Sequence, residues 1–181
     1  MSDTQWPRYQ VFEQLAADQP HQNAGSVHAP DDEMALQMAR DVFVRRPPCM
    51  DLWVARQSAI FGRTAEQLAD PAWRAGAPAP GEPQAFAVFC KTRQAGTHTY
   101  LGQVQAAGPA EALERALAEL APPDALVWWV LPERAIRHSD PADAESLFAP
   151  ARDKTYRDQS EYRSVALMYE IKQAQAKENQ P

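Results

Sequence analysis

The chain has 181 residues, of which 45% are apolar and 23% are charged, and its formal net charge is −6 at neutral pH. This apolar fraction is sufficient for a packed core, while an acidic chain without a basic stripe argues against nucleic acid as a partner. Residues 1–7 lack the pattern of a signal peptide, and no stretch is apolar for long enough to span a bilayer. Cys49 and Cys90 have no CxxC spacing. We expect reduced thiols in a soluble cytoplasmic protein without membrane contact, with a disulfide between them as the less favoured alternative.

The sequence contains one internal repeat. Tyr9-Gln10-Val11-Phe12 is echoed by Phe86-Ala87-Val88-Phe89, and Trp53-Val54 is echoed by Trp129-Val130 after the loss of one residue. Two copies are too few for an extended solenoid. They suggest a pseudo-dimer within one chain, which does what two identical subunits could do by pairing.

The first copy predicts two strands, a helix and a third strand. Residues 9–15 and 24–29 are β-prone, with Gly25 where a bulge or a close approach of the backbone is plausible. Pro30 is expected to open a helix, and Pro47-Pro48 is expected to end it. Its apolar residues recur at three- and four-residue steps and form one stripe, Leu36, Ala39, Val42 and Phe43. Residues 52–60 then supply the third strand.

The second copy follows the same order. Pro109 opens its helix, Pro122-Pro123 follows the end of the apolar stripe, and residues 125–131 form a strand apolar enough to be buried on both faces. An isolated three-stranded sheet with one helix would leave a face and its edges exposed, and pairing two such units would cover both. The sequence therefore predicts an α+β fold of two tandem ββαβ modules, each a small antiparallel or mixed sheet with one helix, packed as a pseudo-dimer and followed by a C-terminal tail.

The domain boundaries follow from this order. We expect a first module at 1–61, a proline- and alanine-rich linker at 62–83, a second, degenerate module at 84–138 and a tail at 139–181. The tail ends in a segment, 165–178, whose composition favours a terminal helix.

No catalytic constellation is visible in the sequence. It contains none of the nucleotide-binding, P-loop, zincin or serine-hydrolase motifs, and no Glu-x-x-His pair of the kind that holds a di-iron site. His21 and His98 occupy equivalent repeat positions and are expected to play one structural part, while His28 and His138 are expected to be hydrogen-bonded or exposed. We therefore predict no catalytic, cofactor-binding or metal site in this chain.

The tryptophans point toward protein contacts. Trp6 and Trp73 lie outside the helix and strand patterns and are candidates for an interface, whereas the equivalent pair Trp53 and Trp129 fits a core. Arg45-Arg46 could bind an anionic ligand, although compensation of the dipole at a helix C-terminus is the favoured interpretation.

Several ordered blocks of the sequence carry a resemblance to known proteins. They are Trp6-Pro7-x-Tyr9-x-Val11-Phe12, His21-x-x-Ala24-Gly25-Ser26-Val27-His28-Ala29, Asp32-Glu33-Met34-Ala35-Leu36-x-x-Ala39-Arg40-Asp41, Arg45-Arg46, Trp53-Val54 and Phe148-x-Pro150-x-x-Asp153-Lys154-x-Tyr156-Arg157. Together these blocks resemble one known family, PaaB, over residues 6–60 and 147–162. The chain departs from that family in length, because members are normally about half as long. Ala149 also stands where the family usually has aspartate, and the second copy lacks the Gly-Ser-x-His block and the Arg-Arg pair.

The resemblance implies a non-catalytic assembly subunit of the phenylacetyl-CoA monooxygenase (ring 1,2-epoxidase) complex. Its partners would be a ferritin-like di-iron oxygenase subunit and a structural ferritin-like subunit, bridged by this chain. The di-iron site, flavin and iron–sulfur cluster would lie in partner subunits, with no cofactor in this chain. A further oligomer is possible. The candidate interface residues are Trp6, Tyr9, Arg45, Arg46, Trp73, Lys154, Tyr156, Arg157 and Tyr162.

Two alternatives remain open at this point. Duplicated α/β sandwiches can form a dimeric barrel around an apolar cavity, so the chain could be a small cofactor-free oxygenase with Trp128, Trp129 or His98 at a pocket. It could also be a ligand-binding regulator. Turnover by the isolated chain would indicate the first, and tight small-molecule binding without a protein partner would indicate the second.

Overall fold

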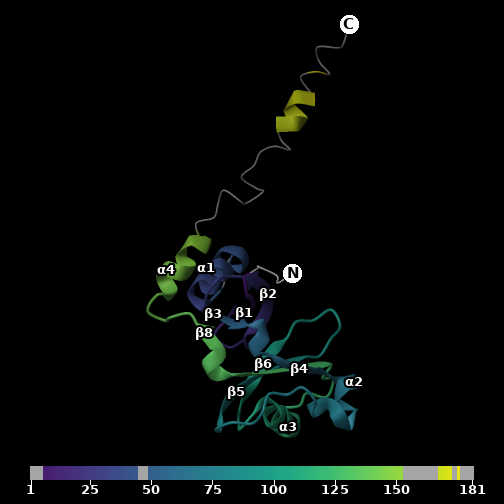
Figure 1. Ribbon diagram of the computed structural model, residues 1–181. Helices are drawn as coiled ribbons and strands as arrows, with labels where there is room; N and C mark the ends of the chain where they lie inside the picture. Colours follow the sequence, from purple (N-terminus) through teal and green to yellow (C-terminus); the bar gives the residue numbers. More distant parts are fainter. Residues whose placement is uncertain (1–5, 45–48, 153–166, 173–174, 176–181) are drawn as a thin grey trace, which may run out of the picture.

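A computed structural model describes residues 6–44, 49–152, 167–172 and 175. The fold is α+β, with helices on the outside of an antiparallel arrangement of eight strands in the order β4-β7-β5-β6-β2-β1-β3-β8 (Figure 1). The strands are β1 (Arg8–Gln14), β2 (Gln22–His28), β3 (Asp51–Arg56), β4 (Phe61–Thr64), β5 (Gln84–Lys91), β6 (Thr99–Ala106), β7 (Val127–Pro132) and β8 (Ile136–His138). The helices are α1 (Asp32–Phe43), α2 (Ala65–Leu68), α3 (Pro109–Glu119) and α4 (Ala144–Arg152), with short 3-10 turns η1 (Gln57–Ala59), η2 (Pro71–Arg74) and η3 (Glu133–Ala135).

We call residues 6–60 the first half and residues 83–136 the second half. β1, β2, α1 and β3 follow one another in the first half, and β5, β6, α3 and β7 follow in the same order in the second. Strands β1–β3 and strands β5–β7 are joined within the sheet by a short β2–β6 contact, in which Gln22 lies opposite Thr99. Backbone hydrogen bonds from Asn23 to His98 and from Tyr100 to His21 support this contact.

The start of α1 differs from the sequence prediction by two residues. The helix begins at Asp32 rather than Pro30, because the Asp31 side chain caps it by accepting a hydrogen bond from the Met34 backbone at 2.8 Å. The predicted end at Pro47-Pro48 lies outside the described residues. Gly25 is a close approach, as expected. Its φ is +143°, and a Cβ there would lie 2.8 Å from the ring of Phe43 at the end of α1.

The second half matches its predicted pattern closely. Pro109 is the first residue of α3, and Ala112, Leu113 and Ala116 form its buried stripe. β7 lies between β4 and β5 as an inner strand. Its Trp128 is almost completely buried, which agrees with the prediction of a strand covered on both faces.

The segments after each half cross over to complete the other half. The third strand predicted at residues 52–60 ends at Arg56, and the chain then turns through η1 to form β4, which pairs with β7 of the second half. In the same way β8, after the second half, pairs with β3 of the first. The stretch predicted as a linker, 62–83, therefore contains most of β4, together with α2 and η2.

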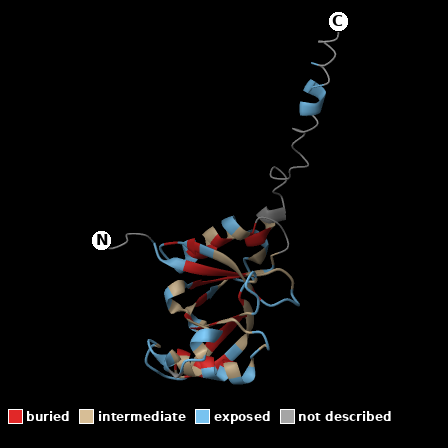
Figure 2. Ribbon diagram, turned by 90° about the vertical axis from the view of Figure 1, so that its right-hand side faces the viewer, coloured by how far each residue is buried: buried red, intermediate tan, exposed pale blue. Residues whose placement is uncertain are grey.

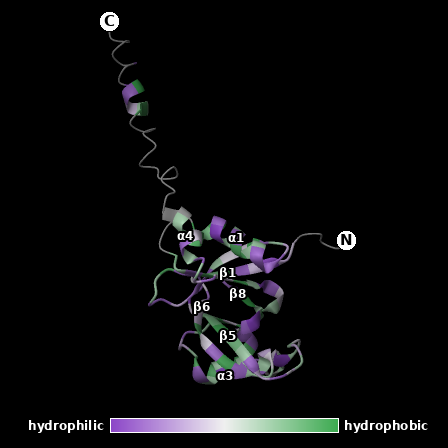
Figure 3. Ribbon diagram, turned by 90° about the vertical axis from the view of Figure 1, so that its left-hand side faces the viewer, coloured by the Kyte–Doolittle hydropathy of each residue, from purple (hydrophilic) through white to green (hydrophobic). Residues whose placement is uncertain are grey.

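Three apolar cores hold this arrangement together (Figures 2 and 3). One lies between α1 and the first-half strands and includes Leu147 and Phe148 of α4. The second lies between α3 and the second-half strands and includes Phe61 of β4. The third lies between the two halves, where the rings of Phe12 and Phe89 stack with centroids 4.2 Å apart. The halves thus pack face to face, with α1 and α4 at one end and α3 at the other (Figure 1).

Candidate partner interface

Each half contains a histidine ring stacked on a tryptophan ring, beside the interface between the halves. The ring of His21 stacks on Trp53 with centroids 3.5 Å apart, and the ring of His98 stacks on Trp129 at the same distance. Both histidines are buried. The expectation that these histidines play one repeated structural part is therefore consistent with the geometry.

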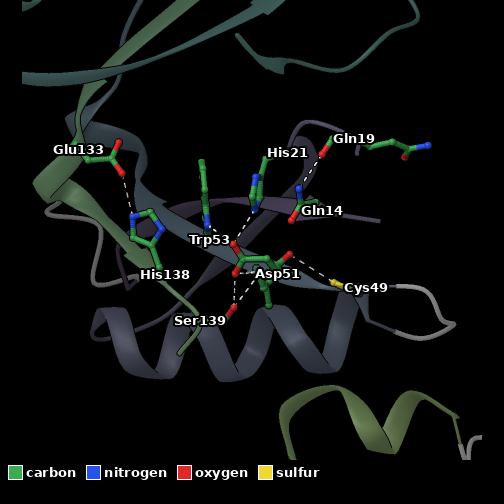
Figure 4. Close-up of polar contacts among 10 residues, drawn as sticks. Gln14, Gln19, His21, Cys49, Asp51, Trp53, Glu133, His138 and Ser139 are labelled. Carbon is green, nitrogen blue, oxygen red and sulfur yellow. Dashed lines mark hydrogen bonds and ion pairs between the residues drawn. The ribbon is translucent and has the colours of Figure 1, made fainter. Parts of the chain in front are cut away.

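In the first half, the carboxylate of Asp51 lies beside the stacked rings of His21 and Trp53 (Figure 4). Asp51 accepts hydrogen bonds from His21 Nε2 at 3.1 Å, from Trp53 Nε1 at 2.8 Å and from the Ser139 hydroxyl. Burial alone would raise the pKa of Asp51, but these hydrogen bonds outweigh it and hold the pKa at about 2. Ser139 directly follows β8, so its hydrogen bond to Asp51 holds β8 against the first half.

The second half lacks this carboxylate, because Val127 occupies the position equivalent to Asp51. His98 Nε2 is buried and has no hydrogen-bond partner among the described residues. Burial, aided by the charge of Lys91, lowers the pKa of His98 to about 4. The neutral ring therefore remains as a packing group, without a polar network around it.

A second polar network closes the first half at the start of α1. The Tyr9 hydroxyl donates to Asp32 at 2.7 Å and accepts from Arg56 Nε at 2.9 Å. Burial and the hydrogen bond to Asp32 raise the pKa of Tyr9, so the phenol stays protonated. Arg137 of β8 donates to Glu33 at 2.9 Å beside this network. Both contacts tie α1 to the strands beneath it.

Exposed apolar side chains are concentrated on the first half. Within residues 6–44 and 49–152, the large apolar side chains classed as exposed are Trp6 (57%), Met34, Val42 and Met50 (51%). All four belong to the first half. Met34 and Val42 lie on α1, and at the two equivalent positions α3 carries Glu111 and Glu119. The two related helices therefore differ at these positions, which are apolar and exposed on α1 and acidic on α3.

The tail begins on the first half. Leu147 and Phe148 of α4 are buried in the first-half core. Residues 167–172 and 175 are helical, within the predicted terminal helix at 165–178. Leu167, Met168 and Ile171 in this segment are each more than half exposed.

The predicted interface residues fall into three groups. Trp6 is exposed, as an interface residue would need to be. Tyr9 is fully buried, so it acts on the surface only by holding Asp32 and Arg56. Trp73 is partly buried, packs on the second-half core and lies under the Arg74 guanidinium. The remaining candidates lie outside the described residues: Arg45, Arg46, Lys154, Tyr156, Arg157 and Tyr162.

Sequence reasoning missed Met34 and Val42, and also Met50 and Asp51. Val42 was expected in the apolar stripe of the first helix, but it is exposed because the buried face of α1 is formed by Ala35, Leu36 and Ala39. Met34 and Val42 carried a usable signal, because alignment of the copies sets each of them against a glutamate. Asp51 carried none, since the copy has valine there and one of its partners, Ser139, lies 88 residues further along the chain.

The described residues contain no helix long and apolar enough to cross a membrane. They also contain no group of three or more histidine, cysteine or acidic side chains arranged for a metal ion. Cys49 and Cys90 are free thiols, and burial, the largest cause, raises the pKa of Cys49 to about 12 and that of Cys90 to about 11. Neither thiol is therefore ionised near neutral pH.

Comparisons with known proteins agree with one another. The model of the family described as "Phenylacetic acid degradation B" (PaaB) matches residues 5–75 and 82–168. The chain is also 39% identical over 67 residues to an Escherichia coli protein named as a subunit of 1,2-phenylacetyl-CoA epoxidase, an alignment covering 37% of this chain and 70% of that relative. No solved structure matches the chain. Because the family model matches most of the sequence, the chain belongs to the PaaB family.

Proposed function

We propose that this chain is a non-catalytic assembly subunit of a multicomponent phenylacetyl-CoA epoxidase and binds the oxygenase subunits through its first half. The relative named as a subunit of such an epoxidase supports membership of the complex. The observation that carries the assembly role is the uneven surface: exposed apolar side chains on α1 and none of that kind on α3. Extended exposed apolar surface marks contact sites on proteins, and on this proposal Met34 and Val42 form part of one.

The halves are, on this proposal, two copies of one module that have diverged in role. Their element order is the same, and the ranges matched by the family model, 5–75 and 82–168, cover both halves. The first copy keeps the Asp51 cluster, the Tyr9 network and the apolar surface. The second copy mainly supplies the surface on which the first packs, so the chain is an internal pseudo-dimer with one partner-binding end.

The partners we propose are a ferritin-like di-iron oxygenase subunit and its structural ferritin-like counterpart, with this chain bridging them. The di-iron site, flavin and iron–sulfur cluster would lie in partner subunits. Helical partners suit the apolar stripe on α1, since helices pack by laying apolar ridges into grooves. We place the chain in the cytoplasm, where buried thiols such as Cys90 stay reduced.

The packing between the halves disfavours the cavity-bearing oxygenase. A dimeric barrel of that type needs an apolar cavity between its sheets, but the space between the two halves is filled by Phe12, Trp53 and Phe89 with their neighbours. His98, a candidate pocket residue of that alternative, is stacked on Trp129.

Co-expression tests the proposal. The tagged chain and the ferritin-like subunits from the same source are expected to elute as one complex in size-exclusion chromatography with light scattering, and phenylacetyl-CoA turnover should depend on this chain. The double variant Met34→Glu/Val42→Glu, which gives α1 the acidic surface of α3, should lose most of the complex. Ala118→Glu, an exposed change on α3, is the matched control. Equal complex formation by both variants, with each folded, would remove α1 from the interface.

A further inference from the structure

A pocket lies in the second half at the start of α3. It has a volume of about 450 Å³, is open to solvent on one side, and is lined by the end of β7, by residues 58–61 at the end of the first half and the start of β4, and by residues 76–81 of the connection between the halves. Gly108, which precedes α3, forms part of its wall and approaches Pro80 of that connection so closely that a Cβ would lie 3.2 Å from the Pro80 Cα. The connection therefore covers one side of the pocket.

The equivalent place in the first half is closed by the Tyr9 network. There the Tyr9 hydroxyl, the Asp32 carboxylate and the Arg56 guanidinium bond to one another, and Arg137 of β8 bonds to Glu33 alongside. In the second half every one of these polar groups is replaced by an apolar residue. Phe86 stands for Tyr9, Pro109 for Asp32, Pro132 for Arg56, Ala110 for Glu33 and Phe61 for Arg137.

Because of these replacements, the second half has a pocket with apolar walls where the first half has a polar contact. Phe61, Phe86, Pro109 and Pro132 all contribute to its wall. Two phenyl rings and two pyrrolidine rings offer apolar surface without a hydrogen bond to close the space between them. The volume is within the range of pockets that hold small molecules, about 300–1,000 Å³. The walls thus suit the apolar body of a small ligand.

Two polar groups at the pocket lack partners. Arg134 lines it, is exposed, and forms no ion pair with any residue that the structure describes. Gln84 also lines it, and its buried Oε1 has no hydrogen-bond partner within the described residues. A buried acceptor left unpaired is destabilising. A ligand with an anionic group and a hydrogen-bond donor would satisfy both.

From this juxtaposition of apolar walls, a free guanidinium and an unpaired amide oxygen, we infer that the second half binds a small amphipathic organic anion. Its apolar body lies against Phe61, Pro109 and Pro132 at the pocket wall, its anionic group pairs with Arg134, and a donor on it reaches Gln84 Oε1. The divergence of the second copy has then created a ligand site where the first copy kept a structural network. This inference does not depend on the assembly role, because the site lies away from the apolar surface of α1.

Fluorescence titration of the full chain tests the inference with two matched probes. The first is 1-anilinonaphthalene-8-sulfonate, which combines an aromatic body, an N–H donor and a sulfonate. The second is N-phenyl-1-naphthylamine, which has the same body and donor without the charge. We expect saturable binding of the sulfonate at one site and at least tenfold weaker binding by Arg134→Ala, with little change for the neutral amine. Arg137→Ala, which removes a first-half guanidinium, is the control.

Amide NMR of the same samples locates the bound probe. Gly76, Gly81 and Gly108 all line the pocket, so their amide signals should shift on titration. The triple variant Phe86→Tyr/Pro109→Asp/Pro132→Arg rebuilds the first-half network and should abolish those shifts. If it does not fold, Arg134→Ala and Gln84→Leu still decide the question. Shifts confined to the first half, or equal loss of affinity in Arg134→Ala and Arg137→Ala, would overturn the inference.

Discussion

Replacement of Asp51 by asparagine tests whether the polar cluster fastens the crossing segment to the first half. The carboxylate accepts hydrogen bonds from His21, Trp53 and Ser139, and its pKa lies at about 2 against an ordinary value of 3.8. That difference corresponds to about 2 kcal/mol of preferential stabilisation of the charged form. An amide has no charge and turns one of its two ends into a donor, so part of these hydrogen bonds is lost.

We therefore expect Asp51→Asn to lower the free energy of unfolding by about 2 kcal/mol at pH 7. Because folding lowers the pKa, the contribution is fully present above the unfolded pKa of about 4 and is lost as pH falls toward 2. The difference between wild type and variant should thus be constant from pH 5 to pH 8. Urea unfolding followed by tryptophan fluorescence and circular dichroism measures it.

Asp124→Asn is the matched control, since Asp124 is an exposed aspartate just before β7. It should change stability by less than about 0.5 kcal/mol. Equal midpoints for the two variants would refute the stabilising role of the Asp51 cluster.

The differences between the two halves, and the strands that cross between them, can be tested in three further ways. NMR titration should give His98 a pKa near 4, and an ordinary pKa near 6.5 would contradict the burial argument. Because folding lowers this pKa, the free energy of unfolding should fall as pH drops from 6.5 toward 4, and His98→Phe should reduce that pH dependence. Gly25→Ala should cost more than Gly102→Ala in thermal unfolding, because both have positive φ but only Gly25 would clash with a ring, at 2.8 Å against 3.8 Å; equal costs would mean that Phe43 moves freely. Cleavage at a protease site placed at residues 78–81 should leave the two fragments together in size-exclusion chromatography, because β4 and β8 each pair with the other half. Fragments that elute separately would show that this reciprocal pairing does not hold the halves together.

The sequence predicted helix starts and close backbone approaches well where they depend on neighbouring residues. Pro109 opens α3, as the missing N–H of proline favours, and Gly25 marks the close approach to Phe43. Pro30 misled the prediction of α1, because Asp31 is the better cap and places the helix start after it.

The crossing of β4 and β8 could not be predicted from the sequence. Residues 52–60 were predicted as one strand, and nothing local shows that the chain turns after Arg56 so that Phe61 pairs with Val130. Such pairing depends on contacts between residues far apart in the chain. The Asp51 cluster has the same origin, since Ser139 reaches it only through β8.

The candidate interface was predicted only in part. Trp6 stood out because it lies outside any strand or helix pattern, and it is exposed. Tyr9 was selected as another aromatic residue of the same segment, but the alternation of side chains along β1 directs its ring into the first-half core. Met34 and Val42 belong to an amphipathic helix, so their exposure becomes informative only when α3 provides the comparison.

Hydrogen exchange of the chain alone and in complex with the ferritin-like oxygenase subunits tests the central claim most directly. The account predicts that binding slows exchange in α1 and in the loop around Met50, while exchange in α3 stays unchanged. Equal protection of α1 and α3, or protection of α3 alone, would contradict a single partner-binding end on the first half.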